Sequence, residues 1–383
     1  MPDERSAVFI GSKLCSTPGF GGDHPLAIPR VASVMQLCGE LGWLEPAEFR
    51  ASPQATVEQL ARFHSREYLA ALVAAQASGA VSIEARERFA IGTRENPVFP
   101  GVFARAATAV GGSILAAQVA LEGQVAFHPA GGTHHGRPAR ASGFCYLNDP
   151  VFALQRLAEE GLTQILYVDL DAHHGDAVQD AVRDDVRMHT ISIHEAGRWP
   201  FTGAAGDRGG GRSYNYPVPK GFNDAELAFL MQEAVLPRAL ELAPEAVVIT
   251  CGTDALAGDP LSGLLLSNGA LWGAVEALVG LAPVAVVLGG GGYNPWTLAR
   301  CWTGLWARLS GREIPGTLPP AARRVLEGLS CDLIEEDMID PHWLTTLADD
   351  LRDGAVRPAV VDLVAAVAAD RPPRRAGRRV CHG

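Results

Sequence analysis

Short apolar runs alternate with longer amphipathic stretches along most of the chain. Several runs rich in Val and Ile, each bounded by polar, Gly or Pro residues, predict strands at 6–11, 124–127, 164–168, 190–193, 246–250 and 284–288. Their apolar residues are continuous rather than alternating, which is typical of strands that are covered on both faces. The pattern therefore predicts a buried sheet.

Between the predicted strands, apolar residues recur with the spacing of amphipathic helices. Predicted helices cover 31–42, 57–68, 69–77, 103–121, 150–160, 176–182, 222–242, 267–281, 297–309, 341–351 and 358–369. Segments rich in Gly and Pro predict loops at 15–29, 92–97 and 197–211. Strands that alternate with helices indicate an α/β fold, with a central, mostly parallel sheet and helices on both faces.

Neither an internal repeat nor a linker divides the chain, so we expect one domain over residues 1–370. The last residues, 371–383, carry arginines without any acidic residue, and we expect this tail to be disordered. Its arginines are Arg371, Arg374, Arg375, Arg378 and Arg379.

Composition narrows the classes of function. The net charge of −11 argues against nucleic-acid binding through bulk electrostatics, although an acidic surface can attract cationic substrates. The 7 cysteines are scattered without a Cys-x-x-Cys pair, which argues against a disulfide framework or a cysteine zinc site. We find neither a secretion signal nor an apolar run of the ~20 residues that span a bilayer. We therefore expect a cytoplasmic protein that does not bind membranes.

The stretch from Tyr167 to Asp176 carries the strongest chemical signal. Asp169, Asp171 and His173 alternate with apolar residues at the end of a predicted strand, so their side chains point to the same side. Open α/β sheets place their sites just beyond the carboxyl ends of the strands. Carboxylate and imidazole at this spacing suit zinc or a similar divalent metal. The alternative is structural, with Asp171 capping a helix and His173 packing in a turn.

Three other predicted strands also deliver polar residues. His134 and His135 follow the strand at 124–127, Asp254 follows 246–250, and Tyr293 follows 284–288. Each has a structural interpretation when taken alone, but the ends of parallel strands meet at one edge of the sheet. A phosphate loop at the four glycines before Tyr293 is poorly supported, because Gly-x-Gly-x-x-Gly fails at Asn294 and no Lys follows.

Together these residues can perform metal-assisted amide hydrolysis. Asp171, His173 and Asp254 would hold a metal and leave a fourth position open, as in catalytic zinc sites. The metal would activate water, and a neighbouring histidine would move its proton. Asp169 and Asp176 would orient the two histidines. The Tyr293 hydroxyl would donate to the developing oxyanion.

These motifs resemble the zinc-dependent histone deacetylase family, particularly its class I-like bacterial members, the acetoin-utilisation deacetylases. The similarity runs from about residue 8 to about residue 310. It rests on Gly131–Gly136, Gly143–Asp149, Asp169–Asp176, Cys251–Asp259 and Gly289–Asn294. The resemblance implies a single-domain arginase/deacetylase-like fold that hydrolyses acetyl-lysine, in a protein or as a small acylated amine. It also implies Zn²⁺, with Fe²⁺ as an alternative on the same ligands, and a structural K⁺.

The resemblance also assigns roles to single residues. It makes His135 the general base and acid, and His134 its electrostatic partner. It places Phe144 and Phe201 in the walls of a substrate tunnel, Glu95 at its rim as the carboxylate that holds the substrate backbone, and Arg30 in an inner cavity that receives acetate. Gly143 and Gly292 also match substrate-binding positions. The potassium ligands would be Asp169, Asp171, His173, Ser192 and Ile193.

Two departures leave the substrate open. The family usually has Pro-Gly-Thr-Gly after the residue matching Phe201, whereas this chain has Thr202–Gly206, and its rim acid is Glu rather than the more common Asp. An arginase-like binuclear manganese hydrolase would need a second aspartate where this chain has Gly175. An acetylpolyamine amidohydrolase is the alternative within the family. A catalytically silent, ligand-binding homologue is the alternative from another class, but each residue that it would lose is present.

Overall fold

The computed structural model describes residues 5–16, 19–22 and 24–369. Its centre is an 8-stranded sheet with the order β2-β1-β3-β8-β7-β4-β5-β6, in which every pair of neighbours is parallel. The strands are β1 Ala7–Gly11, β2 Phe49–Ala51, β3 Val125–His128, β4 Ile165–Asp169, β5 Met188–Glu195, β6 Ser213–Val218, β7 Ala246–Thr250 and β8 Val284–Leu288. The predicted α/β fold is confirmed, and the sheet is parallel throughout.

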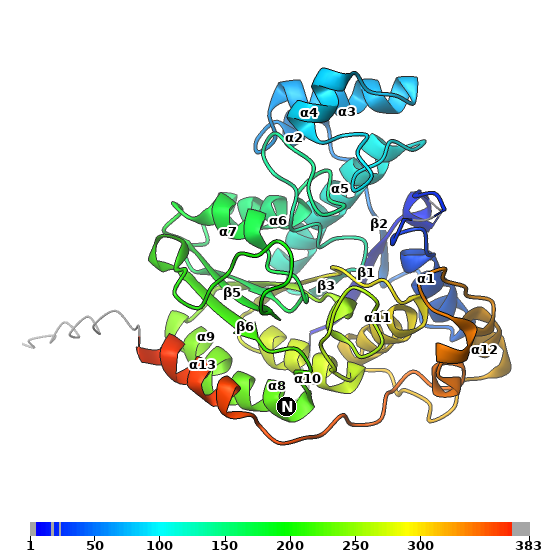
Figure 1. Ribbon diagram of the computed structural model, residues 1–383, viewed down its shortest axis with the longest axis vertical. Coiled ribbons are helices and arrows are strands. Elements are labelled where there is room, and N and C mark those ends of the chain that lie inside the picture. The colour runs from blue at the N-terminus through cyan, green and yellow to red at the C-terminus, as the bar shows by residue number, and fades with distance from the viewer. Residues whose placement is uncertain (1–4, 17–18, 23, 370–383) are drawn as a thin grey trace, which may run out of the picture.

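Helices cover both faces of this sheet (Figure 1). The side chains of the central strands divide between two core clusters: in β1, Phe9 packs on one face with Trp302 and Trp306, while Val8 and Ile10 pack on the other. The helices are α1 Arg30–Glu40, α2 Val57–Leu60, α3 Arg66–Ser78, α4 Ile83–Phe89, α5 Val102–Leu121, α6 Asp149–Glu159, α7 Asp176–Val182, α8 Asp224–Leu230, α9 Leu236–Leu242, α10 Asn268–Val279, α11 Pro295–Leu309, α12 Pro320–Glu327 and α13 Pro358–Ala369. A π-helical segment, Met231–Val235, joins α8 to α9.

Several elements differ from the sequence prediction. The strands β2 and β6 and the helices α4 and α12 were not predicted. The stretch predicted as helical over 57–77 is broken after Leu60, because the Ser65 hydroxyl accepts from the Tyr68 N–H and begins a new helix, α3.

The helix predicted over 341–351 is wrong, since only a 3₁₀ turn forms, at Pro341–Leu344. Beyond this turn the backbone carbonyls accept hydrogen bonds from a buried arginine, Arg300, instead of forming the hydrogen bonds of a helix. The Arg300 guanidinium donates to the carbonyls of Thr346 (2.7 Å) and Ala348 (3.1 Å) and to the Asp349 carboxylate (2.6 Å).

The expectation that the chain lacks an apolar run of membrane-spanning length is also wrong. Helix α5 is long and apolar enough to cross a bilayer by length and composition. However, 67% of its apolar window is buried, and the helix packs against α6 and β3, so it serves as a core helix in this fold.

The strand order explains why distant motifs meet. Strands β3, β8, β7 and β4 are consecutive neighbours, so the loops that follow them emerge side by side at the carboxyl edge of the sheet. At this edge Asp169 pairs in register with Thr250 on one side and Ser192 on the other. The predicted disordered tail, 371–383, lies outside the described residues.

Candidate active site

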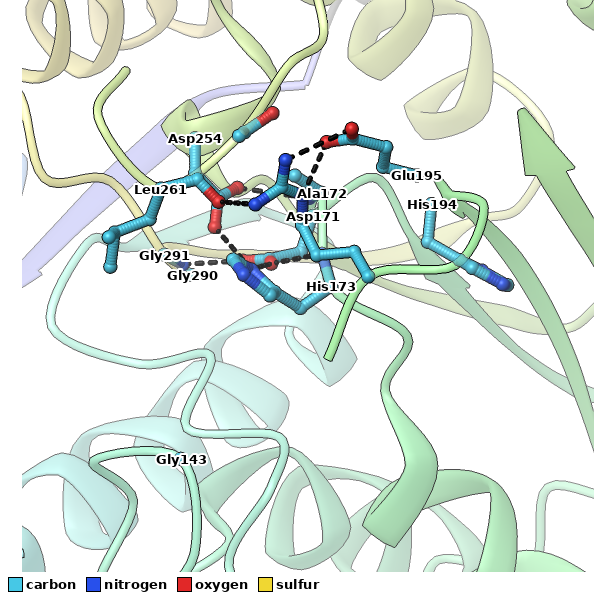
Figure 2. A network of polar contacts seen from close by, with 12 residues as sticks. Gly143, Asp171, Ala172, His173, His194, Glu195, Asp254, Leu261, Gly290 and Gly291 are labelled. Carbon is cyan, nitrogen blue, oxygen red and sulfur yellow. Dashed lines mark hydrogen bonds and ion pairs between the residues drawn. The ribbon is translucent and has the colours of Figure 1, made fainter. Parts of the chain in front are cut away.

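Three metal-ligating side chains meet beyond β4 and β7. The candidate ligand atoms of Asp171, His173 and Asp254 all lie within 4.8 Å of one another, and all three residues are buried. The His173 Nδ1 lies 2.9 Å from Asp254 Oδ2 and 3.3 Å from Asp171 Oδ1. Figure 2 shows the three side chains turned toward one another, with Gly290 and Gly291 beside them.

Backbone groups hold both carboxylates in place. Asp254 Oδ1 accepts from the Ala172 N–H (2.9 Å), and Asp171 Oδ2 accepts from the Gly291 N–H (2.5 Å). Residue 291 must be glycine, because a Cβ there would collide with the Asp254 carboxylate and lie 2.9 Å from Asp171 Oδ2. The run of glycines after β8 therefore forms a cradle for the two aspartates rather than a phosphate loop.

The electrostatics of this group favour a cation. Burial and the charge of Asp171 raise the pKa of Asp254 to about 6. Burial would lower the pKa of His173, but its hydrogen bonds to Asp171 and Asp254 raise it to about 10. Two buried carboxylates that face one imidazole need compensating positive charge. Two oxygens and one nitrogen converging in this way form a donor set that fits zinc and leaves a coordination position open.

Each of the twin histidines beyond β3 forms a pair with an aspartate. The His134 Nδ1–H donates to Asp169 Oδ2 at 2.7 Å, and the His135 Nδ1–H donates to Asp176 Oδ1 at 2.9 Å. Asp176 also accepts from the Arg137 guanidinium. Both imidazoles are thereby oriented, with Nε2 as the free nitrogen of His135.

The two pairs differ in their charge. Burial alone would lower the pKa of His134, but Asp169 and Asp171 raise it to about 9. Burial and the neighbouring charge of His134 lower the pKa of His135 to about 3. Environments that separate the pKa values of two neighbouring titratable groups in this way are typical of acid–base sites. His135 is the member that is neutral and able to accept a proton.

A cavity of about 620 Å³ that opens to solvent reaches His135 and His173. His135, His173 and Tyr293 lie along it together with Gly143 and Phe144. The Tyr293 ring centroid lies 5.9 Å from that of Phe144 and 6.4 Å from that of His173. Burial raises the pKa of Tyr293 well above its usual value, so its hydroxyl is protonated and can donate. The cavity therefore brings together one member of the metal group, a neutral histidine and a phenolic donor.

The mouth of the cavity contains an aromatic residue that the sequence did not single out. The Trp199 ring lies against His135, with centroids 4.6 Å apart, and 6.4 Å from His173. Phe201, predicted as a tunnel wall, also lines the mouth, but 74% of it is exposed. The signal that the sequence offered for Trp199 was its position two residues before Phe201, the predicted wall.

Two further residues support the site, Asp259, which is buried, and His24, which is half-buried. Asp259 ends the motif Cys251–Asp259, and no role was predicted for it. Its Oδ2 accepts from the Tyr293 N–H at 2.7 Å. Burial and the charge of Asp254 raise the pKa of Asp259 to about 7. His24 was not predicted, and its ring lies edge-on to Phe144 with centroids 4.7 Å apart.

The remaining predicted residues lie close to the same edge. Arg30 is half-buried, donates to the Gly290 carbonyl, and lines a second, smaller cavity of about 140 Å³, whose lining shares Phe144 with the first. Gly292 adjoins Tyr293 and packs against Thr253. Ser192 and Ile193 lie in β5 next to the end of β4, and the Ser192 hydroxyl contacts His194 Nδ1 at 2.8 Å.

Comparisons with known proteins agree with this geometry. The model of the histone deacetylase domain matches residues 24–309. The acetoin utilization protein AcuC of Bacillus subtilis is 34% identical over 337 residues, which cover 82% of this chain and 85% of that protein. Human histone deacetylase 1 is 34% identical over 310 residues, covering 78% of this chain and 64% of that protein.

Solved structures extend the similarity to the whole fold. The crystal structure of a histone deacetylase homologue from Aquifex aeolicus has a TM-score of 0.90 and 36% identity, and covers 95% of this chain and 100% of that one. A homologue complexed with SAHA has a TM-score of 0.88, 36% identity and the same coverage.

Proposed function

The chain belongs to the histone deacetylase family, and from this premise we propose that it is a zinc-dependent deacetylase that hydrolyses acetyl-lysine, in a protein or as a small acylated amine. One arrangement carries the proposal. The buried Asp171–His173–Asp254 group lies beside His135, whose ring centroid is 6.3 Å from that of His173. Tyr293 lines the same cavity, with its ring centroid 6.4 Å from that of His173.

In this proposal Asp171, His173 and Asp254 hold the metal. A zinc ion bound there supplies Lewis acidity toward the acyl oxygen and toward water. Asp171 and Asp254 are positioned for this task by backbone N–H groups, so their carboxylates need little rearrangement on binding. The cell's choice between Zn²⁺ and Fe²⁺ is measurable as the metal content of the protein after anaerobic purification.

The chain's own residues then move the protons. Neutral His135 accepts a proton from the attacking water and later donates one to the leaving amine. Asp176 orients the His135 ring, and protonated His134, held by Asp169, adds positive charge beside it. The Tyr293 hydroxyl donates to the oxyanion of the tetrahedral intermediate. Arg30 lies behind Phe144, in the smaller cavity, where it would attract the carboxylate product.

We also propose a structural potassium ion at Asp169, Asp171, His173, Ser192 and Ile193. Support comes from the register of the sheet, which sets Asp169 beside Ser192 at the ends of β4 and β5. A melting temperature that is the same in KCl and NaCl at equal ionic strength would argue against it.

The decisive experiment is an assay of the zinc-loaded protein on a fluorogenic acetyl-lysine peptide, with and without SAHA. Turnover that SAHA inhibits is the expected result. If the protein retains zinc but leaves the peptide intact, acetylputrescine is the next substrate, and its hydrolysis would indicate the acetylpolyamine alternative. If neither substrate is turned over while SAHA still binds, the chain is a silent, ligand-binding homologue.

A further inference from the structure

The wall of the cavity at Phe144 is built on a strained turn. Gly143 and Phe144 have φ values of 53° and 65°, both in the left-handed region. Glycine adopts this region readily, but a bulky residue such as phenylalanine does so only when its surroundings impose it. Because the Phe144 ring faces Tyr293 across the cavity, the turn sets the width of the site. Groups that hold the turn therefore control the position of the substrate.

Glu95 is connected to both residues of this turn, to Gly143 directly and to Phe144 by way of His24. Its Oε1 accepts from the Gly143 N–H at 3.0 Å, and its Oε2 accepts from the Asn96 side chain at 3.2 Å. Its backbone carbonyl accepts from His24 Nε2 at 3.1 Å, and the His24 ring packs edge-on against Phe144. The side chain of Glu95 thus holds Gly143 directly, while its backbone holds Phe144 through His24.

The opposite side of the turn is closed by Trp199. A Cβ at Gly143 would collide with the Trp199 ring and lie 2.7 Å from His135 Cδ2, so the two faces of Gly143 are occupied by Trp199 and by the Glu95 carboxylate. Figure 2 places Gly143 on a loop separate from the metal group. The turn is therefore closed by its own backbone hydrogen bonds between Ser142 and Cys145 (3.1 and 2.8 Å) and is held from outside by contacts from distant segments.

We propose that Glu95 is a positioning residue whose main effect on turnover passes through the Gly143–Phe144 turn, more than through contact with the substrate backbone. This inference rests on the proposed deacetylase function for its activity readout only. Both carboxylate oxygens already have partners within the protein. Residue 95 is glutamate where the family commonly has aspartate, so its carboxylate extends one methylene further toward the Gly143 N–H.

The two roles predict opposite results for two conservative variants. Glu95→Gln keeps the length and the oxygen that accepts from Gly143, and its new amide can donate to Asn96 Oδ1, which lacks a partner in the described structure. Glu95→Asp keeps the charge but shortens the reach. Positioning through the turn needs length, whereas capture of substrate amide groups needs a carboxylate at the rim.

The assay uses the zinc-loaded full chain and two substrates, an acetyl-lysine peptide and N-butylacetamide, which has no backbone amide beyond the scissile one. We expect Glu95→Gln to stay within about twofold of the parent and Glu95→Asp to lose kcat by about tenfold to a hundredfold on both substrates, as misplacement of a reacting group does. Arg94→Ala, a change of one charge at an exposed neighbour, is the matched control and should match the parent.

The inference is overturned if Glu95→Asp is active and Glu95→Gln loses peptide turnover through KM alone, with N-butylacetamide unaffected. It is also overturned if the two variants behave alike. Hydrogen exchange of peptides that span 141–146, measured without substrate, separates this failure from failure of the proposed function. Faster exchange in Glu95→Asp but not in Glu95→Gln supports the positioning role even if the parent turns over neither substrate, and equal exchange in both variants contradicts it.

Discussion

The inner end and the mouth of the cavity are built in different ways. The inner end, formed by Asp171, His173, Asp254 and the twin histidines, follows directly from the ends of adjacent parallel strands and is buried. The mouth, formed by Glu95, Gly143, Phe144, Trp199 and Phe201, comes from loops whose contacts join distant segments. The order of the parallel strands therefore brings the inner end together, while the mouth depends on contacts between loops.

This comparison suggests that the chemistry is set at the inner end and the choice of substrate at the mouth. Changes at the inner end should remove activity for every substrate. Changes at the mouth should alter it by smaller factors that depend on the substrate. The predictions below test this division, from the largest expected effect to the smallest.

Asp254→Ala should abolish metal retention. The substitution removes one of three protein ligands and leaves Asp171 and His173, and even loss of a hydrogen-bonding partner behind a ligand weakens metal affinity by ~10–100-fold. Elemental analysis of the purified variant checks this, and its circular dichroism spectrum serves as the control for folding. A variant that keeps one equivalent of zinc would show that Asp254 is not a ligand.

Tyr293→Phe should retain zinc and fold but lower kcat by roughly 10²–10³, the usual cost of removing an oxyanion donor. The phenyl ring keeps the contacts with Phe144 and His173, so only the hydroxyl is lost. Steady-state kinetics on the acetyl-lysine peptide measure the loss. Unchanged turnover would remove Tyr293 from the mechanism.

His64 is hydrogen-bonded to the segment that carries the twin histidines, and it should make the free energy of unfolding depend on pH. Burial lowers the pKa of His64 to about 4. Its Nδ1–H donates to the Arg137 carbonyl, and its Nε2 accepts from the Asn148 N–H, so the native state needs the neutral imidazole. Because the unfolded state binds this proton from about pH 6.5 downward, the stabilisation is complete above that pH and is lost as the pH falls toward 4.

Between pH 7 and pH 5 this one group should lower the free energy of unfolding by about 2 kcal/mol. Urea unfolding of the parent and of His64→Gln at both pH values isolates the contribution, since the other titrating groups are shared. The variant should be less stable at pH 7 but should lose less stability on acidification. Equal losses in the two proteins would contradict the role of His64.

At the mouth, Trp199→Ala and Phe201→Ala should differ. Trp199 packs on His135, so its removal should lower turnover by about tenfold through misplacement of the imidazole, and Trp199→Phe should restore most of it. Phe201 is 74% exposed, so Phe201→Ala should change turnover by no more than about twofold, which corresponds to the ±0.5 kcal/mol that is usual for surface substitutions. Kinetics on the peptide measure both, with melting temperatures as controls. A larger loss of turnover in Phe201→Ala than in Trp199→Ala would show that Phe201 forms the wall of the cavity, as the family resemblance implies.

Much of the fold could be predicted from local pattern, and the errors have physical causes. Strand β6 alternates polar and aromatic residues after a Gly-rich loop, so it lacks the continuous apolar run of the central strands. The segment 341–351 has a helical pattern, but buried Arg300 recruits its carbonyls. Competition of this kind between a helix and a distant side chain is invisible in the sequence of either segment.

By itself, the sequence determined the parallel α/β fold and the residues that converge at the inner end, because strand periodicity and strand ends are local properties and parallel strands end at one edge. It also identified the family through its motifs. Only the tertiary structure decided which groups form the mouth: that Glu95 reaches Gly143, that Trp199 rather than Phe201 covers His135, and that His24 supports Phe144. Those contacts join residues 48 to 120 positions apart, and the free energy that selects them comes from packing and desolvation of the folded chain.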